Sequence, residues 1–273
     1  MPGRRAMVAL LACELAGAAA ADPTLTVVAG GRTAIYTPTG LLGLPAATSV
    51  AIPADFAYRH AMTFRAVPVS ALLQGATQDD AVRITSADGF RTVLPAAALL
   101  ASGAAYLAVE PADAPWPPLK PGLAGTAGAF YLVWSHPDRG PLSREQWPYQ
   151  IVKIETVATP ARRFPMTAPA ASVPANHPIR AGFAAFQKHC ASCHTINGGG
   201  ESTAGPDLNI PYNPTEYLRP DALRRLIRDP QALHRWPESR MPAFDARTLP
   251  DRELAELVAY LRHMADHKVV PAR

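Results

Sequence analysis

The stretch FQKHCASCHTINGGG, residues 186–200, decides how the C-terminal part of this chain folds. It holds two of the three cysteines in the sequence, Cys190 and Cys193, with two residues between them and His194 directly after the second. The third cysteine, Cys13, lies close to the N-terminus. A chain that is so poor in cysteine, and yet places two thiols beside an imidazole, indicates a specific chemical use for them.

The pattern Cys-x-x-Cys-His is typical of covalent haem attachment. Two thioethers have to form with two vinyl groups on one edge of a flat macrocycle, and two intervening residues allow about one turn of chain between the sulfurs. The next residue then lies beneath the ring, where the imidazole Nε2 can bind iron. We predict one covalent haem c, attached through Cys190 and Cys193 and ligated by His194.

Three other uses of the cysteine pair agree less well with its surroundings. A thioredoxin-type dithiol lies at the N-terminus of a helix that follows a strand, whereas this pair ends a run that is helical in pattern. A structural zinc site needs four ligands, and the chain has no second cysteine pair. A disulfide between residues this close in sequence closes a very small loop, gains little stability and leaves His194 without a role.

The composition is that of a globular protein without a strong electrostatic preference. The 273 residues are 48% hydrophobic and 18% charged. The formal net charge of +4 is spread along the chain, with +1 in residues 1–21, +1 in 22–175 and +2 in 176–273. Because no segment concentrates Lys and Arg as counterion-driven binding requires, nucleic acid is excluded as a partner.

The N-terminus has the pattern of an export signal. Arg4 and Arg5 precede a short apolar core, and the small residues around Ala21 suit cleavage. We therefore predict a signal peptide at residues 1–21 and a periplasmic location. The run LLAC, which ends at Cys13, also approximates a lipoprotein cleavage box. A lipid at Cys13 would be the only membrane attachment, because no later stretch is apolar over the length of a membrane span.

Residues 22–157 are predicted to form an α+β domain with a mixed or antiparallel sheet. Runs of β-branched and aromatic residues alternate there with Gly, Pro and Asp turns, and Asp88-Gly89 favours a hairpin. Two short helical runs begin at Val67 and Pro95. The expected strands lie in LTVVAG, TSVAIP, MTFRAVP, VRITSADGFRTVLP, YLAVE, AFYLVWS and QIVKIETV.

A proline-rich segment separates this domain from a helical one. Residues 158–176 contain several prolines and have no amphipathic period, which indicates a semi-rigid linker. Residues 177–273 are predicted to form an all-α domain, because their apolar residues follow the helical period. The expected helices lie in PIRAGFAAFQKHC, PDALRRLIRD and DRELAELVAYLRHM.

The helical domain resembles a class I cytochrome c in two further motifs. GPDL, residues 205–208, matches the family's Gly-Pro segment, and RMPAF, residues 240–244, matches its distal loop. The resemblance implies that the carbonyl of Pro206 accepts the Nδ1–H of His194, which fixes the tautomer of the ring. It also implies that Met241 is the second axial ligand, whose thioether raises the reduction potential relative to bis-histidine ligation.

This resemblance covers roughly residues 178–264 and implies two crossing helices that meet at Gly182, Phe186 and Tyr260. Other sulfur and imidazole groups are expected to have other roles. Met264 is expected to pack on the apolar face of the last helix. The remaining candidates are Met166 in the linker and four histidines expected to be exposed or to cap helix ends: His189, His234, His263 and His267.

Residues 25–157 resemble the pterin-binding domain of the sulfite oxidase family. The shared features are a helix start of the Y-x-G-V-P-L type, a DGY-type hairpin and a final strand of the K-x-V-x-x-I type, in YRHAMTFRAVPVSALLQG, VRITSADGFRTVLP and WPYQIVKIETV. Family members that hold molybdenum ligate it through a protein cysteine. The nearest cysteines here are Cys13 and Cys190, so we expect neither molybdenum nor a working molybdopterin site.

Other chemistry-bearing residues of the first domain are expected to be structural. His60 and Met62 supply two soft ligands on one strand, which is too few for a copper site. Four aromatic residues are expected to pack in the core or in loops, although an interface enriches the same residue types: Tyr106, Trp116, Trp134 and Trp147.

The sequence therefore predicts a periplasmic c-type cytochrome that transfers single electrons, with the first domain used for docking onto redox partner proteins. With both axial positions of the iron filled, the haem domain is not expected to be an enzyme. One alternative is a cytochrome-containing subunit of a periplasmic oxidoreductase, with catalysis in the first domain or in a partner. Another is a haem-based sensor, which needs a sixth ligand that can be displaced.

Overall fold

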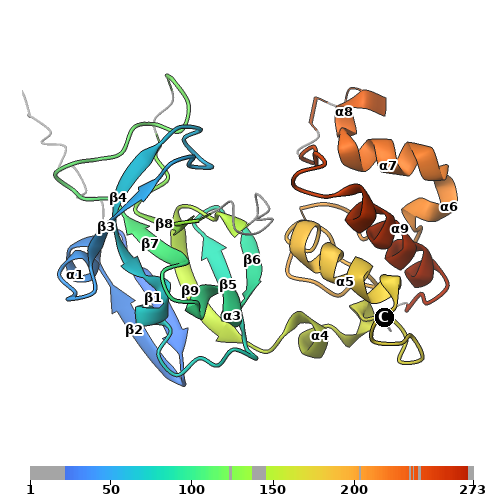
Figure 1. The fold of residues 1–273 in the computed structure, drawn as a ribbon, viewed down its shortest axis with the longest axis horizontal. Helices are drawn as coiled ribbons and strands as arrows, with labels where there is room; N and C mark the ends of the chain where they lie inside the picture. The colour runs from blue at the N-terminus through green and yellow to red at the C-terminus, as the bar shows by residue number, and fades with distance from the viewer. Residues whose placement is uncertain are drawn as a thin grey trace, which may run out of the picture.

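The computed structural model describes residues 22–122, 125–136, 146–202, 204–233, 235, 237–238 and 241–269. These residues form a β-rich region that ends at Val157 and a helical region that follows it (Figure 1). The expected signal peptide and the possible lipid site at Cys13 lie outside the described residues. Within the described ranges, no helix is both long and apolar enough to serve as a membrane span.

One sheet of the β-rich region has five strands in the order β2-β1-β9-β5-β6. The strands are β1 (Leu25–Ala29), β2 (Arg32–Tyr36), β5 (Ala81–Ser86), β6 (Arg91–Pro95) and β9 (Ile151–Val157). β1 and β9 are parallel, and the other neighbours are antiparallel. This sheet is therefore mixed, as the sequence predicted.

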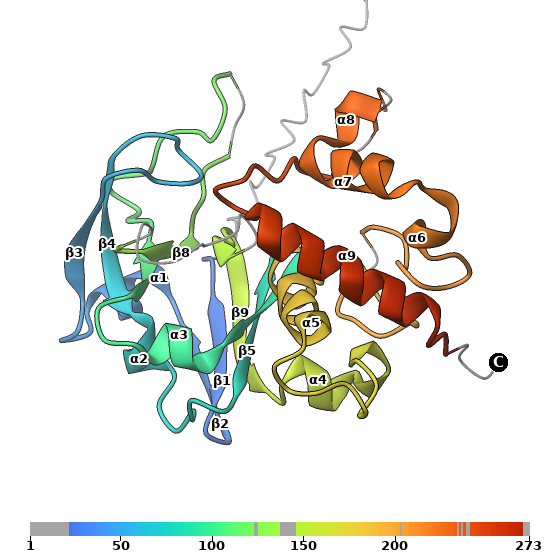
Figure 2. The ribbon, with the colours of Figure 1, turned by 45° about the vertical axis from the view of Figure 1, so that its right-hand side comes forward.

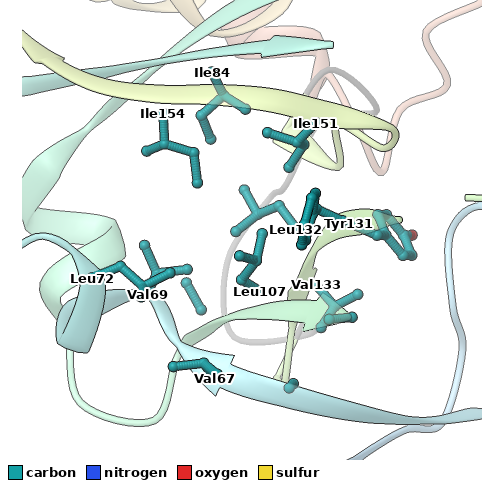
Figure 3. Packing of buried hydrophobic residues seen from close by; sticks show 14 of the residues in the cluster. Val67, Val69, Leu72, Ile84, Leu107, Tyr131, Leu132, Val133, Ile151 and Ile154 are labelled. Carbon is teal, nitrogen blue, oxygen red and sulfur yellow. The ribbon is translucent and has the colours of Figure 1, made fainter. Parts of the chain in front are cut away.

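The other sheet has four antiparallel strands in the order β3-β4-β7-β8. They are β3 (Thr48–Ile52), β4 (Met62–Pro68), β7 (Ala105–Val109) and β8 (Phe130–Trp134). The two sheets enclose one apolar core. Figure 3 shows side chains of β5 and β9, such as Ile84 and Ile154, facing side chains of β7 and β8, such as Leu107 and Leu132.

Short helices complete this region: α1 (Pro38–Leu42), α2 (Val69–Leu72) and α3 (Ala96–Leu100). The expected strands, the Asp88-Gly89 turn and the two expected helices are present, which confirms the predicted α+β fold. β2 and α1 were not predicted. β2 pairs with β1 across Gly30 and Gly31, which adopt φ of 54° and 73°, but its side chains are mostly exposed and give no apolar period.

The helical region contains α5 (Pro178–His189), α6 (Pro214–Tyr217), α7 (Pro220–Arg228), α8 (Pro230–Leu233) and α9 (Asp251–Ala265). α5, α7 and α9 confirm the predicted helices, whereas the single-turn helices α6 and α8 were not predicted. Figure 2 shows α9 crossing α5. At the crossing, a Cβ on Gly182 would lie 1.9 Å from the carbonyl oxygen of Glu256. Only glycine permits this approach of the two backbones.

The segment expected to be a semi-rigid linker contacts the helical region through its backbone. It contains α4 (Pro160–Arg163) and a 3-10 helix, η3 (Pro165–Thr167). The hydroxyl of Tyr260 donates to the carbonyl oxygen of Thr167 at 2.6 Å, and Nδ2 of Asn197 donates to that of Met166 at 3.0 Å. Proline at the first helical position starts both of these short turns. The contacts were not predicted, because their acceptors are backbone carbonyls, which no side-chain pattern reveals.

Candidate functional site

The cysteine pair lies on a turn that continues α5. The helix ends at His189, and the N–H groups of Cys193 and His194 then donate to the carbonyl oxygen of Cys190 at 3.0 and 2.8 Å. Residues three apart on a helical turn lie on the same side of it. The turn therefore brings the half-buried Cys190 and Cys193 to one face of the chain.

His194 is held between this turn and the Gly-Pro segment. Its Nδ1 lies 2.8 Å from the carbonyl oxygen of Pro206, so the Nδ1–H donates to Pro206 and Nε2 carries the lone pair. A Cβ on Gly205 would lie 2.4 Å from Cε1 of the ring, which means that only glycine fits there. Burial lowers the pKa of His194, against the opposing effects of the Pro206 carbonyl and the Asp207 charge. The lowered pKa favours the neutral imidazole, which is the form that binds a metal.

Met241 lies on a loop that α7 holds in place. The residue is half-buried and packs against the apolar cluster of the helical region, as does Leu208 after the Gly-Pro segment. Nη1 of Arg228 donates to the carbonyl oxygens of Phe244 and Leu249, at 2.9 and 2.6 Å. One guanidinium therefore fixes the course of the loop after Met241.

These residues fit a covalently attached haem. The donor set consists of two thiols on one face of a turn, an imidazole whose Nδ1 is already occupied, and a thioether against the same cluster. Gly205 lets its segment pack directly against the imidazole ring, because a Cβ there would collide with the ring. Soft sulfur and imidazole ligands are those found on haem iron in c-type cytochromes.

The other methionines of this region are committed elsewhere. Met264 is 1% exposed and lies in the core beneath α9. Met166 lies in η3, where its sulfur is close to Gly199: a Cβ on that glycine would be 2.6 Å away. His234 and Arg240 lie outside the described residues.

Three histidines of the helical region contact protein groups. Nε2 of His263 accepts a backbone N–H from the segment before α5 at 3.1 Å, and its ring stacks on His267 at 4.1 Å. The prediction for His189 is wrong, because this residue is 3% exposed and its Nε2 lies 3.1 Å from Oε1 of Glu253. It follows Gly182 at i+7 on the buried face of α5. Burial and the charge of a neighbouring lysine lower its pKa to about 4, against the effect of Glu253.

The described residues of the first domain bring no comparable set of ligands together. His60 is exposed, with Nδ1 2.8 Å from the carbonyl oxygen of the next residue, and Met62 is half-buried at the start of β4. In the part of the chain that the structure describes, no three His, Cys, Asp or Glu side chains form a metal-binding group. Trp116, Trp134 and Trp147 are buried, which confirms that these aromatic residues belong to the core.

Glu201, which sequence analysis missed, joins the two regions. It lies just after the three glycines that follow the motif, and its side chain is 10% exposed. Arg83 of β5 donates from Nη1 to Oε2 of Glu201 at 3.2 Å, and Arg163 of α4 donates to Oε1. Arg83 also pairs with Glu155 of β9 at 2.8 Å. No sequence signal predicts these contacts, because Arg83 and Glu201 are 118 residues apart.

The attachment turn faces strand β6 across this junction. A small cavity of about 20 Å³ lies between them, with room for about one water molecule. Arg91 and Thr92 of β6 line it from one side, and Ala191 and Ser192 of the motif line it from the other. The β-rich region and the two residues between the cysteines thus line the same cavity.

Residues 177–261 match the family model described as cytochrome c oxidase, cbb3-type, subunit III. The match runs from the N-cap of α5 into α9 and includes the attachment turn, the Gly-Pro segment and the Met241 loop. The C-terminal region is therefore a cytochrome c domain, which implies haem and electron transfer. The fold of the chain is thus an α+β region followed by a helical cytochrome c region, as predicted.

Two further comparisons give less. A search of curated proteins finds no match. Among solved structures, the sulfane dehydrogenase SoxCD from Paracoccus pantotrophus is similar at a TM-score of 0.36 and 15% identity, over 50% of this chain and 38% of that chain. A likeness at this level carries no inference about activity.

Proposed function

We propose that this chain is an exported electron carrier with one covalent haem, bound by Cys190, Cys193, His194 and Met241. The observation that carries the proposal is the 2.8 Å contact between Nδ1 of His194 and the carbonyl oxygen of Pro206. Because Nδ1 holds the proton in this contact, the lone pair lies on Nε2, which points away from Pro206. His194 directly follows the cysteine pair, so this lone pair is available to an iron held there. The family match over the same residues supports it.

Each residue of the site has a defined task in this proposal. Haem, when bound, takes up and releases one electron at a time. The two thiols hold it covalently, so that a carrier that repeatedly leaves its partners keeps its cofactor. Pro206 fixes the tautomer and orientation of His194, and Met241 supplies a soft second ligand that favours the reduced state.

The apolar cluster of the helical region gives the site an apolar surrounding, because Cys190 and Met241 pack against it. Phe186, Phe244 and Leu257 are each at most 4% exposed in it. Low polarity disfavours the extra positive charge of the oxidised iron, which raises the reduction potential in the same direction as Met241 does. The domain's residues therefore favour a carrier of relatively high potential.

We further propose that the β-rich domain positions the haem domain for redox partner proteins. The support is the junction at Glu201, which holds the attachment turn beside β6, and the absence of cysteine from residues 22–157. Export to the periplasm rests on the pattern of residues 1–21. In this proposal residues 22–157 and 177–273 are the two domains, and residues 158–176 are a connection fastened to the second.

Metal analysis combined with a redox titration tests the proposal. Protein made with c-type maturation machinery is expected to contain one iron per chain, molybdenum at background and a low-spin spectrum that titrates as a one-electron couple. Protein made without that machinery serves as the control and should lack haem. Stoichiometric molybdenum, or a high-spin oxidised iron with an open position, would contradict the assignment.

A further inference from the structure

Asp207 connects the two segments on either side of His194. Its Oδ2 accepts a hydrogen bond from the hydroxyl of Thr195 at 2.8 Å and another from the N–H of Gly198 at 2.7 Å. Thr195 directly follows His194, and Asp207 directly follows Pro206. One carboxylate oxygen of Asp207 therefore joins the segment that follows His194 to the segment that contains Pro206, the acceptor of the His194 ring.

The second oxygen of Asp207 fixes its own segment. Oδ1 accepts from the N–H groups of Asn209 and Ile210, at 2.8 and 2.9 Å. With all four donors in place, the carboxylate cannot rotate without losing several hydrogen bonds at once. Burial alone would raise the pKa of Asp207, but the three N–H donors and the Thr195 hydroxyl outweigh it and lower this pKa.

Backbone hydrogen bonds run beside this link but do not replace it. The N–H of Gly205 donates to the carbonyl oxygen of Cys193 at 2.7 Å, and that of Leu208 donates to Thr195 at 2.9 Å. These bonds set the distance between the segment around His194 and the segment around Pro206. The hydrogen bond from the Thr195 hydroxyl to Asp207 joins the two segments through side chains, directly beside His194.

We infer that Asp207 is a positioning residue for His194. Asp207 fixes Pro206 relative to Thr195, and it lowers the reduction potential of the bound haem. This inference rests on the proposed function. A firm Nδ1–H···O=C bond makes the imidazole more basic, and a nearby carboxylate stabilises the more positive, oxidised iron. Both effects favour the oxidised state, so loss of Asp207 raises the potential.

Two variants separate charge from position. Asp207→Asn removes the charge. The new amide either points its NH2 group at the N–H of Gly198, which it repels, or rotates away from Gly198. Thr195→Val keeps the charge and the β-branched shape but removes the hydroxyl link. Asp221→Asn is the matched control, because Asp221 is a surface carboxylate of α7 whose side chain is 70% exposed.

The measurements are a spectroelectrochemical titration and the electron paramagnetic resonance of the oxidised haem, whose g values report the orientation of axial ligands. Asp207→Asn should shift the ratio of reduced to oxidised protein at a fixed potential about tenfold toward reduced, which is about 59 mV for one electron. Thr195→Val should shift the ratio less and still change the g values. Asp221→Asn should leave both unchanged.

Wild-type potential and g values in both Asp207→Asn and Thr195→Val would overturn the inference. If Asp207→Asn takes up no haem, Thr195→Val decides, and a wild-type spectrum in that variant would overturn it as well. A wild-type protein that does not titrate as a one-electron couple would instead contradict the proposed function.

Discussion

The two regions of the molecule differ in what the partners of two polar side chains, Asp55 and His194, leave available. In the β-rich region Asp55 is 3% exposed, yet its carboxylate accepts from the N–H of Tyr58 at 2.8 Å and from the hydroxyl of Tyr131 at 3.1 Å. These groups satisfy one another and hold the loop before β4 to the core. In the helical region, by contrast, the bond from His194 to Pro206 engages Nδ1 and directs Nε2 elsewhere.

This difference shows where function can be argued from structure. A buried carboxylate whose partners are protein groups has a sufficient structural explanation. Two thiols on one turn, an imidazole of fixed tautomer directly after them and a thioether on the apolar cluster of the same region are instead the ligand set of a c-type haem. The helical region is therefore expected to depend on a cofactor, whereas the β-rich region is expected to be stable without one.

Replacing both cysteines should break the comparison most strongly. Cys190→Ser with Cys193→Ser is expected to abolish covalent haem, because both thioethers are lost, and to destabilise the helical region alone. Haem staining after denaturing electrophoresis measures the first effect, and limited proteolysis measures the second. Ser192→Ala, between the cysteines, is the control and should keep its haem. Covalent haem in the double variant would refute the attachment site.

Met241→Ala should have the next largest effect. Loss of the thioether is expected to lower the reduction potential by more than one tenfold step, about 59 mV, and to open the iron to small ligands. The oxidised spectrum should lose its weak sulfur–iron charge-transfer band. Met264→Leu should keep that band and cost less than about 1.5 kcal/mol of stability. A band that survives in Met241→Ala would show that another residue is the ligand.

Truncation tests whether the segment before α5 belongs to the helical region. A haem-loaded fragment from residue 175 lacks the carbonyl acceptors of Tyr260 and Asn197, whereas one from residue 158 keeps them. Each unsatisfied buried group costs about 1–3 kcal/mol, so denaturant unfolding should find the shorter fragment less stable. Equal stability would return this segment to the role of a passive linker. Both fragments should accept electrons from the physiological donor more slowly than the full chain.

Glu201→Gln should have the smallest effect, since it loosens the junction without touching the haem ligands. Loss of the paired charge is expected to cost about 1–2 kcal/mol and to speed proteolysis between the regions. The difference in stability between the wild type and Glu201→Gln should be smaller at high salt, which screens the charges. Glu216→Gln removes the exposed pair with Lys268 and provides the control. Unchanged proteolysis in Glu201→Gln would mean that Glu201 does not hold the regions together.

The sequence predicted the parts of this molecule that depend on local pattern. The motif at Cys190, the apolar face of α9 and the hairpin at Asp88-Gly89 each lie within a short stretch of residues. The turn between β1 and β2 was missed although Gly30-Gly31 is a hairpin signal, because the exposed side chains of β2 obscured it.

Other features could not be predicted because they depend on distant parts of the chain. The contact of Glu201 with Arg83 and the bond of Tyr260 to the carbonyl of Thr167 join residues 118 and 93 positions apart. Such contacts require the packed structure. The burial of His189 could have been found, since the helical period from Gly182 places it on the inner face of α5.

Peptide mapping of the mature protein tests the central claim most directly. The haem-loaded chain is digested after alkylation of accessible thiols, and the peptide that contains Cys190 and Cys193 is sequenced by mass spectrometry. We predict one haem on this peptide, bound through both cysteines, and none elsewhere. A peptide with both thiols alkylated, or joined to each other as a disulfide, would contradict the account.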